Sequence, residues 1–444
     1  MTKKVRSANK KQIMKNIFIT GLTSTTEGGM QFHNLGNYII TEPLFHLLRK
    51  GFPDAKISTS IQLEKSFYNK YDLTQLTNER FFTYGKKTAQ KTVIDIIHIL
   101  LWKITKSKKF LSTPLLSELN KSDLIIDFSG DIYGDNANWR RFIESNMRLL
   151  FSLILGKKVA MIIGSPGPFK SYWRLIIAKY ILPKLSLITN REELSTKMLS
   201  YIGISGKNIV TTACPSILFR KDDQNDLKNS SDYKNIFSDK RPIIGLIICG
   251  WNMPDGPYNK WPRTKESFNS FVSLILRLNS SFDHRICIMS HQNATDKEGS
   301  LCAGNDHKIL NEIVNEVRKK TDNDKIFTLK GHYTAGQSKT IIGQFDILIS
   351  GRIHGAVQGL SQNIPTIILD YGHEPKAHKM LGFALMYNMN IYLCQPNDNI
   401  KIIKCAKEIL ENHEIINDKL KRRTQEVKLL AESNIDLIKK HCLQ

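Results

Sequence analysis

An arginine and a histidine two residues apart give the sequence its clearest chemical signal. Arg352 and His354 stand between Gly351 and Gly355, directly after an apolar run at 346–350 that is typical of a buried strand. The helical pattern that follows exposes unpaired N–H groups and the positive end of a helix dipole at its first turn. There, an arginine can bind a carboxylate or phosphate through two parallel hydrogen bonds, and a histidine can transfer a proton near neutral pH. The segment predicts an anion site with a proton donor.

This segment also has a purely structural interpretation. Arg352 could form an ion pair within the protein, and His354 could pack against a carbonyl beside a capped helix. Both interpretations stay open on the local sequence.

Arg191 offers a second guanidinium at the end of another predicted strand. The apolar run at 185–189 precedes it, and Glu192 and Glu193 begin a helical pattern. Ligands of parallel α/β sheets lie beyond the carboxyl ends of the strands, so we expect Arg191 in the same cleft as Arg352. The alternative is a surface turn in which the glutamates favour the helix dipole.

Four more polar residues follow predicted strands and are candidates for the acceptor side of a site. Asn34 and Asn37 precede the first long helical pattern, where they could cap the helix or bind an acceptor. Asp131 could hold a sugar hydroxyl or act as a base. His291 could be a ligand or a structural residue.

Neither a metal nor a bound cofactor is expected. The acids around Asp131 lack the EF-hand pattern, and no lysine follows the glycines at 164–167 at the spacing of a Walker loop. No two cysteines form a CxxC pair, which indicates reduced thiols rather than disulfides or structural zinc. The seven cysteines are Cys214, Cys249, Cys287, Cys302, Cys394, Cys405 and Cys442.

The charge balance points to an anionic partner. The 444 residues include 64 basic and 41 acidic ones, a net charge of +23. Because the lysines are scattered and no aromatic-interleaved or zinc-finger pattern occurs, nucleic acid is not the expected partner. The longest apolar runs are too short to span a bilayer, and the N-terminal apolar run is too short for a signal peptide. We expect a cytoplasmic protein with peripheral contact to the anionic inner face of the cell membrane.

Strand-like and helix-like patterns alternate along the whole chain, which is typical of βαβ units and parallel sheets. The polar stretch 221–241 predicts a linker between a first Rossmann-like domain at 1–220 and a second at 242–400, and residues 401–444 are expected to be helical. Eleven strands are predicted, at 16–20, 55–59, 123–129, 158–163, 185–189, 208–213, 242–250, 285–291, 325–331, 345–351 and 365–372.

In this order, the motifs resemble those of the polysaccharide pyruvyl transferase family. The resemblance covers about residues 16–385 and rests on "NLGNYII", "SDLIIDFSG", "GKKVAMIIGSPGPF", "LITNREELSTKMLSYIGI" and "QFDILISGRIHGAVQGLSQNIPTIILDYG". It implies two facing Rossmann-like domains of the glycosyltransferase-B type. It also implies an enzyme that moves the pyruvyl group of phosphoenolpyruvate onto sugar hydroxyls of an exopolysaccharide or its lipid-linked precursor, forming a ketal.

The resemblance also implies roles for particular residues. The donor carboxylate and phosphate would lie on Arg352 with support from Arg191, and His354 would transfer the proton. No metal is needed, because arginines can neutralise the leaving phosphate. A family lysine corresponds to Lys376 or Lys379, of which Lys376 is taken as the site residue.

The sequence departs from the family pattern mainly on the acceptor side. Asn37 stands where the family has an aspartate, and Ser129-Gly130 stands where it has a pair of glycines. Cys214-Pro215 stands where the family has Asp-Pro-Ala. Two rivals to pyruvyl transfer therefore stay open. One is a nucleotide-sugar glycosyltransferase with the same architecture, and the other is a non-catalytic glycan-binding relative.

Overall fold

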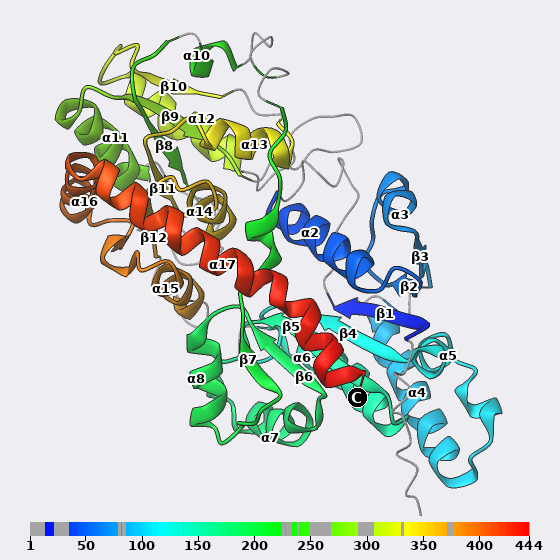
Figure 1. Ribbon diagram of the computed structural model, residues 1–444. Helices are drawn as coiled ribbons and strands as arrows, with labels where there is room; N and C mark the ends of the chain where they lie inside the picture. Colours follow the sequence, from blue (N-terminus) through cyan, green and yellow to red (C-terminus); the bar gives the residue numbers. More distant parts are fainter. Residues whose placement is uncertain are drawn as a thin grey trace, which may run out of the picture.

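The computed structural model places two parallel β-sheets, one in each half of the chain (Figure 1). It describes residues 14–21, 35–78, 81, 86–135, 137–223, 227, 233–237, 239–248, 268–291, 306–329, 333–370 and 377–443. The fold class expected from the sequence, α/β with two Rossmann-like domains, is confirmed.

The first sheet has seven strands in the order β3-β2-β1-β4-β5-β6-β7. All its recorded pairings are parallel, and helical segments connect the strands that follow one another in the chain. Their bounds are β1 Asn16–Gly21, β2 Lys56–Thr59, β3 Leu73–Gln75, β4 Leu124–Phe128, β5 Lys158–Gly164, β6 Leu187–Asn190 and β7 Ile209–Thr211.

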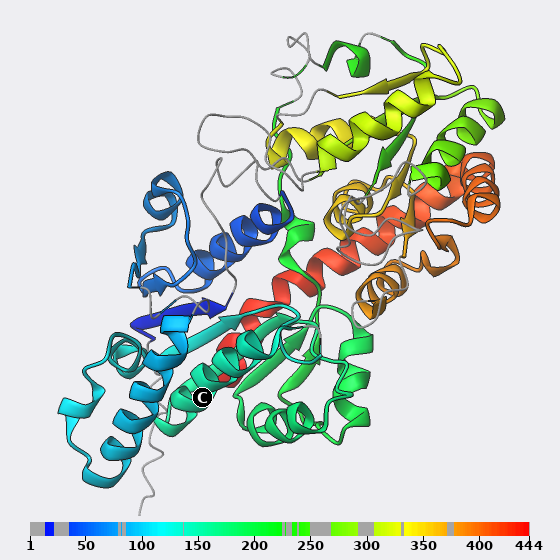
Figure 2. The same ribbon diagram turned by 180° about the vertical axis from the view of Figure 1, so that it is seen from behind.

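Helices cover both faces of this sheet (Figure 2). One face packs against α2, α3 and the C-terminal helix, and the other packs against α4 to α8. The bounds are α2 Leu35–Gly51, α3 Lys65–Tyr71, α4 Lys86–Thr105, η2 Lys108–Leu111, α5 Pro114–Lys121, α6 Trp139–Ile154, α7 Tyr172–Ile181, η3 Leu182–Lys184, α8 Glu193–Tyr201 and η4 Pro215–Leu218.

The second sheet has six parallel strands in the order β10-β9-β8-β11-β12-β13. Its strands are β8 Ile243–Ile247, β9 Arg285–Met289, β10 Ile326–Thr328, β11 Ile347–Ser350, β12 Thr366–Leu369 and β13 Leu393–Cys394. Its helices are α10 Lys234–Phe237, α11 Asn269–Ser281, α12 Asp306–Arg318, α13 Ala335–Ile342, α14 Ile353–Leu360, α15 Ala377–Met386, η7 Asn390–Tyr392, α16 Asn399–Glu411 and α17 His413–Cys442.

Each of the eleven predicted strands overlaps an observed strand, and β1, β5 and β6 extend one residue beyond the prediction. The two strands that were not predicted, β3 and β13, have three and two residues and lie at sheet edges. β3 has a single apolar residue and β13 has only two residues, so neither forms a recognisable apolar run, whereas the equally peripheral β7 and β10 begin with two apolar residues each.

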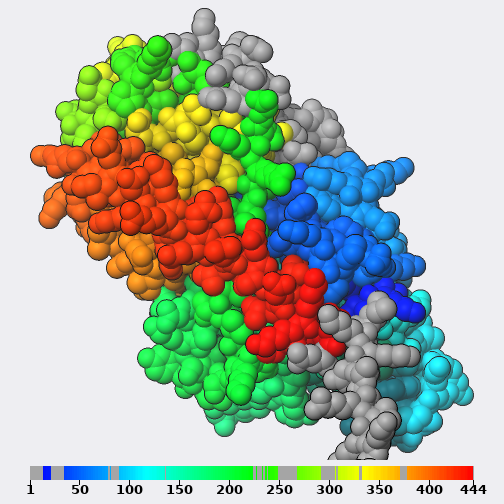
Figure 3. Space-filling model, viewed as in Figure 1, coloured from blue at the N-terminus to red at the C-terminus, as the bar shows by residue number. Residues whose placement is uncertain are grey.

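The long helix α17 joins the two domains. It runs from α16 in the second domain across to the first, along one side of the molecule (Figures 1 and 3). In the second domain, Thr424 Oγ1 donates to the Leu360 carbonyl at 3.0 Å. In the first, Asn434 Oδ1 accepts from Thr189 Oγ1 at 2.9 Å and from Thr212 Oγ1 at 3.1 Å. These buried hydrogen bonds fix α17 to both sheets.

Helix α2 makes a second connection between the domains. Its buried Leu35 and Ile39 belong to the same apolar cluster as Ile247, Met289 and Tyr333 of the second domain. The N-terminus of α2 is therefore held against the carboxyl ends of the second-domain strands, where the Arg352 segment lies.

Candidate functional site

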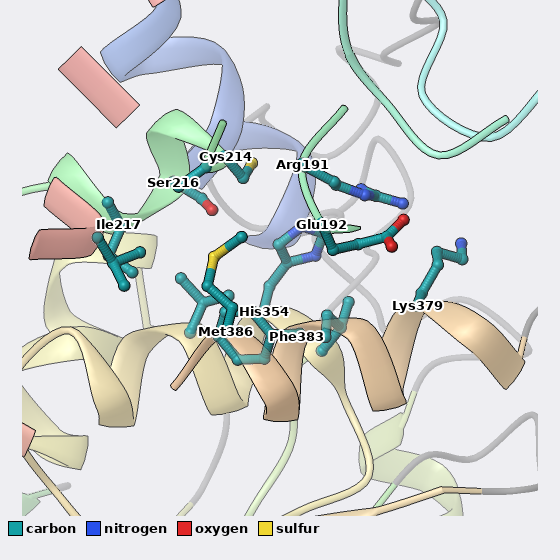
Figure 4. A pocket seen from close by; sticks show the side chains of 13 residues that line it. Arg191, Glu192, Cys214, Ser216, Ile217, His354, Lys379, Phe383 and Met386 are labelled. Atoms are coloured by element: carbon teal, nitrogen blue, oxygen red, sulfur yellow. The ribbon is translucent and has the colours of Figure 1, made fainter. Parts of the chain in front are cut away.

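A pocket lies between the domains, where strand ends of both sheets face each other. Arg191, Glu192 and Cys214 line it from the first domain, and His354 and Lys379 from the second. In Figure 4, Arg191, Glu192 and Lys379 lie to one side of the His354 ring, and Cys214 and Ser216 lie to the other. Apolar side chains complete the lining, namely Ala213, Ile217, Ile353, Val357, Phe383, Met386 and Val427.

His354 is in the first turn of α14 and reaches across the domain boundary to α2. A Cβ added at Gly36 would overlap the His354 imidazole, so a glycine at this point of α2 lets the ring approach the helix backbone. Burial lowers the pKa of His354 well below its usual range, and the next largest effects are those of Arg191, His291 and Lys379. The ring is therefore neutral at pH 7 and lies in a positive electrostatic environment.

Arg191 follows β6 and projects into the pocket from the first domain. Its Nε donates to Ser165 Oγ at 2.6 Å, and its backbone N–H donates to the Gly164 carbonyl at 3.0 Å. Among the residues that the structure describes, no carboxylate forms an ion pair with Arg191. Its guanidinium is thus oriented by a neutral hydroxyl and is available to an anionic ligand.

Glu192 has a structural role in the motif that contains Arg191. It is the N-cap of α8, where its carboxylate accepts from the Ser195 N–H at 2.8 Å and from the Ser195 hydroxyl. Burial raises the pKa of the Glu192 carboxyl, although the Ser195 hydrogen bonds and the charge of Arg191 oppose that shift. The cap fixes the turn that aims Arg191 into the pocket.

Arg352 is the N-cap residue of α14 and is engaged by a buried acid. Its Nε donates to Asp306 Oδ2 at 3.1 Å, and its Nη2 pairs with Asp306 Oδ1. Asp306 begins α12 and is almost fully buried. The ion pair that the sequence left open as an alternative is therefore present, and Arg352 is a fixed charge behind His354.

An ion pair also joins the two domains beside the pocket. Lys379 of α15 pairs with Asp131, which follows β4 in the first domain. Asp131, predicted on the acceptor side, is thus near the site, and Lys379 is the lysine found in the pocket lining. Lys376, the predicted lysine, lies outside the described residues.

His291 lies behind the pocket and is buried. Its Nε2 is 3.1 Å from Gln358 Oε1 of α14, and its backbone N–H donates to Asp306 at 3.3 Å. Burial, with a further effect of Arg352, lowers the pKa of His291 to about 4. His291 is therefore a neutral residue that braces α14, and among the described residues it is not part of the pocket lining.

The two predicted glycines have packing roles at the strand-to-helix turn. The Gly351 N–H donates to the Ile247 carbonyl at 2.7 Å. A Cβ at Gly355 would lie 2.8 Å from Ser350 Oγ and 2.9 Å from Ile247 Cδ1, so only glycine lets α14 lie this close to the sheet.

The structure says little about the two predicted asparagines. Asn37 is half-buried in α2, and its carbonyl accepts from Thr41 Oγ1 at 2.6 Å. Asn34 lies outside the described residues.

The residues that sequence reasoning missed have no local signal. Gly36 is remarkable only beside His354, which is 318 residues away along the chain, and Asp306 pairs with Arg352 across 46 residues. In the part of the chain that the structure describes, no group of three His, Cys, Asp or Glu side chains could hold a metal ion.

The fold and this interdomain pocket define the class of protein. Two Rossmann-like domains with a pocket between them have the glycosyltransferase-B fold. Within that class, the chain belongs to the polysaccharide pyruvyl transferase family, whose model matches residues 34–373. The match includes Asp131, Arg191, Arg352 and His354, and the family is one of transferases that act in polysaccharide biosynthesis.

Solved structures share the fold at low sequence identity. A glycosyltransferase from Rickettsia africae is 13% identical with a TM-score of 0.56, and the alignment covers 97% of this chain and 99% of that one. The HepE protein of Anabaena in complex with UDP is 9% identical with a TM-score of 0.58, covering 96% and 100%. The UDP-GlcNAc 2-epimerase of Neisseria meningitidis bound to UDP-GlcNAc is 11% identical with a TM-score of 0.56, covering 96% and 100%. A comparison with curated proteins gave no match.

The described helices include none whose length and apolar character would let it cross a membrane.

Proposed function

We propose that the protein transfers the pyruvyl group of phosphoenolpyruvate to hydroxyls of a sugar in a surface polysaccharide or its lipid-linked precursor, forming a ketal. One observation carries the proposal. Arg191, without an ion-pair partner among the described carboxylates, faces a half-buried neutral histidine that other cations surround. An anionic substrate with two charged groups fits that environment.

The donor would lie between Arg191 and Lys379, with its reacting carbon near His354. Phosphoenolpyruvate has a carboxylate and a phosphate only a few bonds apart, so cations from two domains can each hold one group. Lys379 can serve in this way when donor oxygens compete with Asp131 for its amino group. Arg352, held by Asp306, adds its charge from behind.

The reaction divides into two additions to one carbon. A proton reaches the methylene carbon of the donor, the first sugar hydroxyl bonds to the adjacent carbon, and the C–O bond to phosphate breaks. The second hydroxyl then bonds to the same carbon and completes the ketal. The hydroxyls supply two protons in total, one for the new methyl group and one for the departing phosphate. His354 would relay the proton to carbon, and Asp131 would accept one from a hydroxyl.

The bound donor would itself prepare His354 for this task. In the empty site the pKa of His354 is lowered by burial and nearby cations. A dianion beside the ring would oppose the effect of those cations and raise the pKa of His354. Donor binding would thus favour the protonated form that can give a proton to the donor. Proton transfer of this kind contributes about 10²- to 10⁴-fold in rate.

Calorimetry on the purified full chain tests the proposal. We expect phosphoenolpyruvate to bind, pyruvate and inorganic phosphate to bind more weakly, and the product glycan to gain the mass of a pyruvyl ketal. A protein that does not bind phosphoenolpyruvate and leaves the glycan mass unchanged in cells with and without it would refute pyruvyl transfer.

A nucleotide-sugar glycosyltransferase is the second candidate, because the fold is shared with HepE in complex with UDP. Titration with UDP, UDP-glucose and UDP-GlcNAc discriminates between the two. Tight binding of a nucleotide sugar without binding of phosphoenolpyruvate would favour this candidate. Binding of neither, together with binding of the glycan, would indicate a non-catalytic glycan-binding relative.

A further inference from the structure

Helix α4 exposes a row of apolar side chains and buries two polar ones, although its Ile99 lies in the core. Thr92 and Asp95 are buried, and Thr92 Oγ1 donates to Glu144 Oε1 of α6 at 2.6 Å. The exposed residues are Val93, Ile94, Ile97, Leu100, Leu101 and Ile104. A continuous stripe of this kind over three turns marks a contact surface, because scattered single apolar residues would not share one helix face.

Helix α7 shows a second stripe on the same side of the molecule. Tyr172, Trp173, Ile176 and Tyr180 are exposed on it, and Trp139 is exposed at the start of α6. The helices α4, α6 and α7 cover one face of the first sheet, opposite to α17 (Figures 1 and 2). We call these exposed residues of α4, α6 and α7 the apolar face.

The charges around the apolar face are mostly basic, and the nearby acids Glu118 and Asp135 are already bonded within the protein, to Ser58 and Arg174. Residues 86–117 contain seven lysines and one acid, Asp95, and residues 136–191 contain one acid, Glu144; both acids are buried. Exposed cations at its edge are Lys103, Lys106, Lys108, Lys109, Arg140, Lys170, Lys179 and Lys184.

Several of these cations stack on aromatic rings next to the apolar face. Lys106 Nζ is 4.8 Å from the centre of the Trp102 ring, and Lys184 Nζ is 3.1 Å from that of Tyr180. Tryptophan and tyrosine beside lysine are the side chains that favour the boundary between lipid headgroups and acyl chains.

We propose that the apolar face docks the first domain on an anionic phospholipid bilayer. The apolar side chains enter the headgroup boundary, and the surrounding lysines bind lipid phosphates. A second copy of the chain is less suitable as the occupant. A two-fold symmetric contact through this face would bring two identical rims of lysine together without acids to neutralise them.

If the proposed function is correct, docking through the apolar face would also bring the pocket toward a lipid-linked acceptor in the bilayer. Helices α6 and α7 follow β4 and β5, and Arg191 follows β6, so all three emerge from the carboxyl edge of one sheet. The aromatic residues at the starts of α6 and α7 therefore lie on the side of the domain from which the pocket is lined.

Vesicle co-sedimentation of the full chain tests the docking. We expect binding to vesicles of phosphatidylglycerol and phosphatidylcholine, weak binding to pure phosphatidylcholine, and loss of binding when NaCl rises from about 0.1 M to about 0.5 M. Ile97→Glu/Ile104→Glu should weaken vesicle binding by about tenfold or more, because two carboxylates would enter the anionic headgroup layer.

A matched variant controls for added negative charge. Ile400 on α16 and Ile415 on α17 are 75% and 58% exposed, against 80% for Ile104 and 51% for Ile97, and they lie in the other half of the chain. Ile400→Glu/Ile415→Glu should therefore retain most of the vesicle binding. Both variants should bind phosphoenolpyruvate as the unmodified chain does, so failure of docking is distinguishable from failure of the proposed function.

Three results would overturn the proposal. These are equal binding to neutral and anionic vesicles, equal effects of the two double substitutions, and absence of vesicle binding. A dimer in solution that Ile97→Glu/Ile104→Glu dissociates, without vesicle binding, would assign the apolar face to a second copy of the chain instead.

Discussion

At the scale of single residues, the site combines Arg191, which pairs with no carboxylate among the described residues, with cations that are already bound to carboxylates of the protein. Arg191 is oriented by Ser165, whereas Lys379 pairs with Asp131 and Arg352 with Asp306. An incoming anion gains most from a cation that does not have to leave a carboxylate first. Arg191 is therefore the residue on which donor affinity should depend most directly.

Arg191→Ala should weaken phosphoenolpyruvate binding by about tenfold to a hundredfold, since a charge-assisted hydrogen-bond pair is lost while the cap of α8 by Glu192 stays. Calorimetric titration measures this effect. Arg277→Ala, at an exposed position on α11, is the matched control and should leave the affinity unchanged. Unchanged donor affinity in Arg191→Ala would remove Arg191 from the site.

His354→Asn should reduce turnover about 10²-fold or more and change donor affinity little, because the residue acts on a proton rather than as a charge that holds the donor. The pH dependence of turnover at saturating donor gives the second readout, and the variant should lose one ionisation from that profile. A variant with unchanged turnover and the same ionisation would make His354 a packing residue against Gly36.

At the scale of elements, Arg352 connects the start of α14 to the start of α12. The acid of this pair is deeply buried, so the pair holds two helix starts beside the pocket. Removing one partner from a buried ion pair leaves the other charge without compensation, which is far more destabilising than a lost surface pair.

Arg352→Lys should therefore lower both activity and stability, because an ammonium group cannot reproduce the two-pronged contact with Asp306. We expect most activity to be lost and the free energy of unfolding to fall by about 1–3 kcal/mol. Urea unfolding and donor titration on the same samples separate the two effects. A stable variant that has lost donor affinity would identify Arg352 as a direct donor ligand, and near-normal catalytic efficiency would exclude any role in the site.

At the scale of the whole molecule, stability depends on buried groups that ionise differently in the folded and unfolded chain. Burial lowers the pKa of His291 from 6.5 to about 4. Burial also raises the pKa of Asp127 from 3.8 to about 6. Between pH 6.5 and pH 4, the unfolded chain protonates His291 while the folded one does not, so this residue makes the protein less stable as the pH falls. Asp127 acts in the opposite direction between pH 6 and pH 4.

On going from pH 6.5 to pH 4, the free energy of unfolding of His291→Gln should fall by about 1–3 kcal/mol less than that of the unmodified chain. Glutamine keeps a polar group near Gln358 without the ionisation. Asp127→Asn should steepen the same loss, because it removes the group that favours the folded state at low pH. Urea unfolding at several pH values checks both slopes, and identical slopes in all three proteins would contradict the assignment to these groups.

The sequence by itself determined eleven of the strands and the places where chemistry could occur. Parallel strands are buried on both faces, so apolar β-branched runs such as 346–350 and 158–163 mark them without reference to the rest of the chain. A strand end that leads into a helix is likewise a local event, which is why Arg191, Arg352 and His354 could be selected.

Only the tertiary structure decided which charges compensate one another. The glycine that admits the His354 ring comes from α2, the acid that engages Arg352 comes from α12, and the acid that pairs with Lys379 comes from the opposite domain. Electrostatic pairing and steric fit depend on distances of a few ångströms between segments that are dozens to hundreds of residues apart in the chain. For the same reason, the exposed side of α4 could not be known from its sequence. Apolar residues occur on more than one side of this helix, and tertiary packing buries Ile99 in the core and bonds Thr92 to Glu144 of α6. The apolar residues on the remaining side, such as Ile97 and Ile104, are therefore exposed.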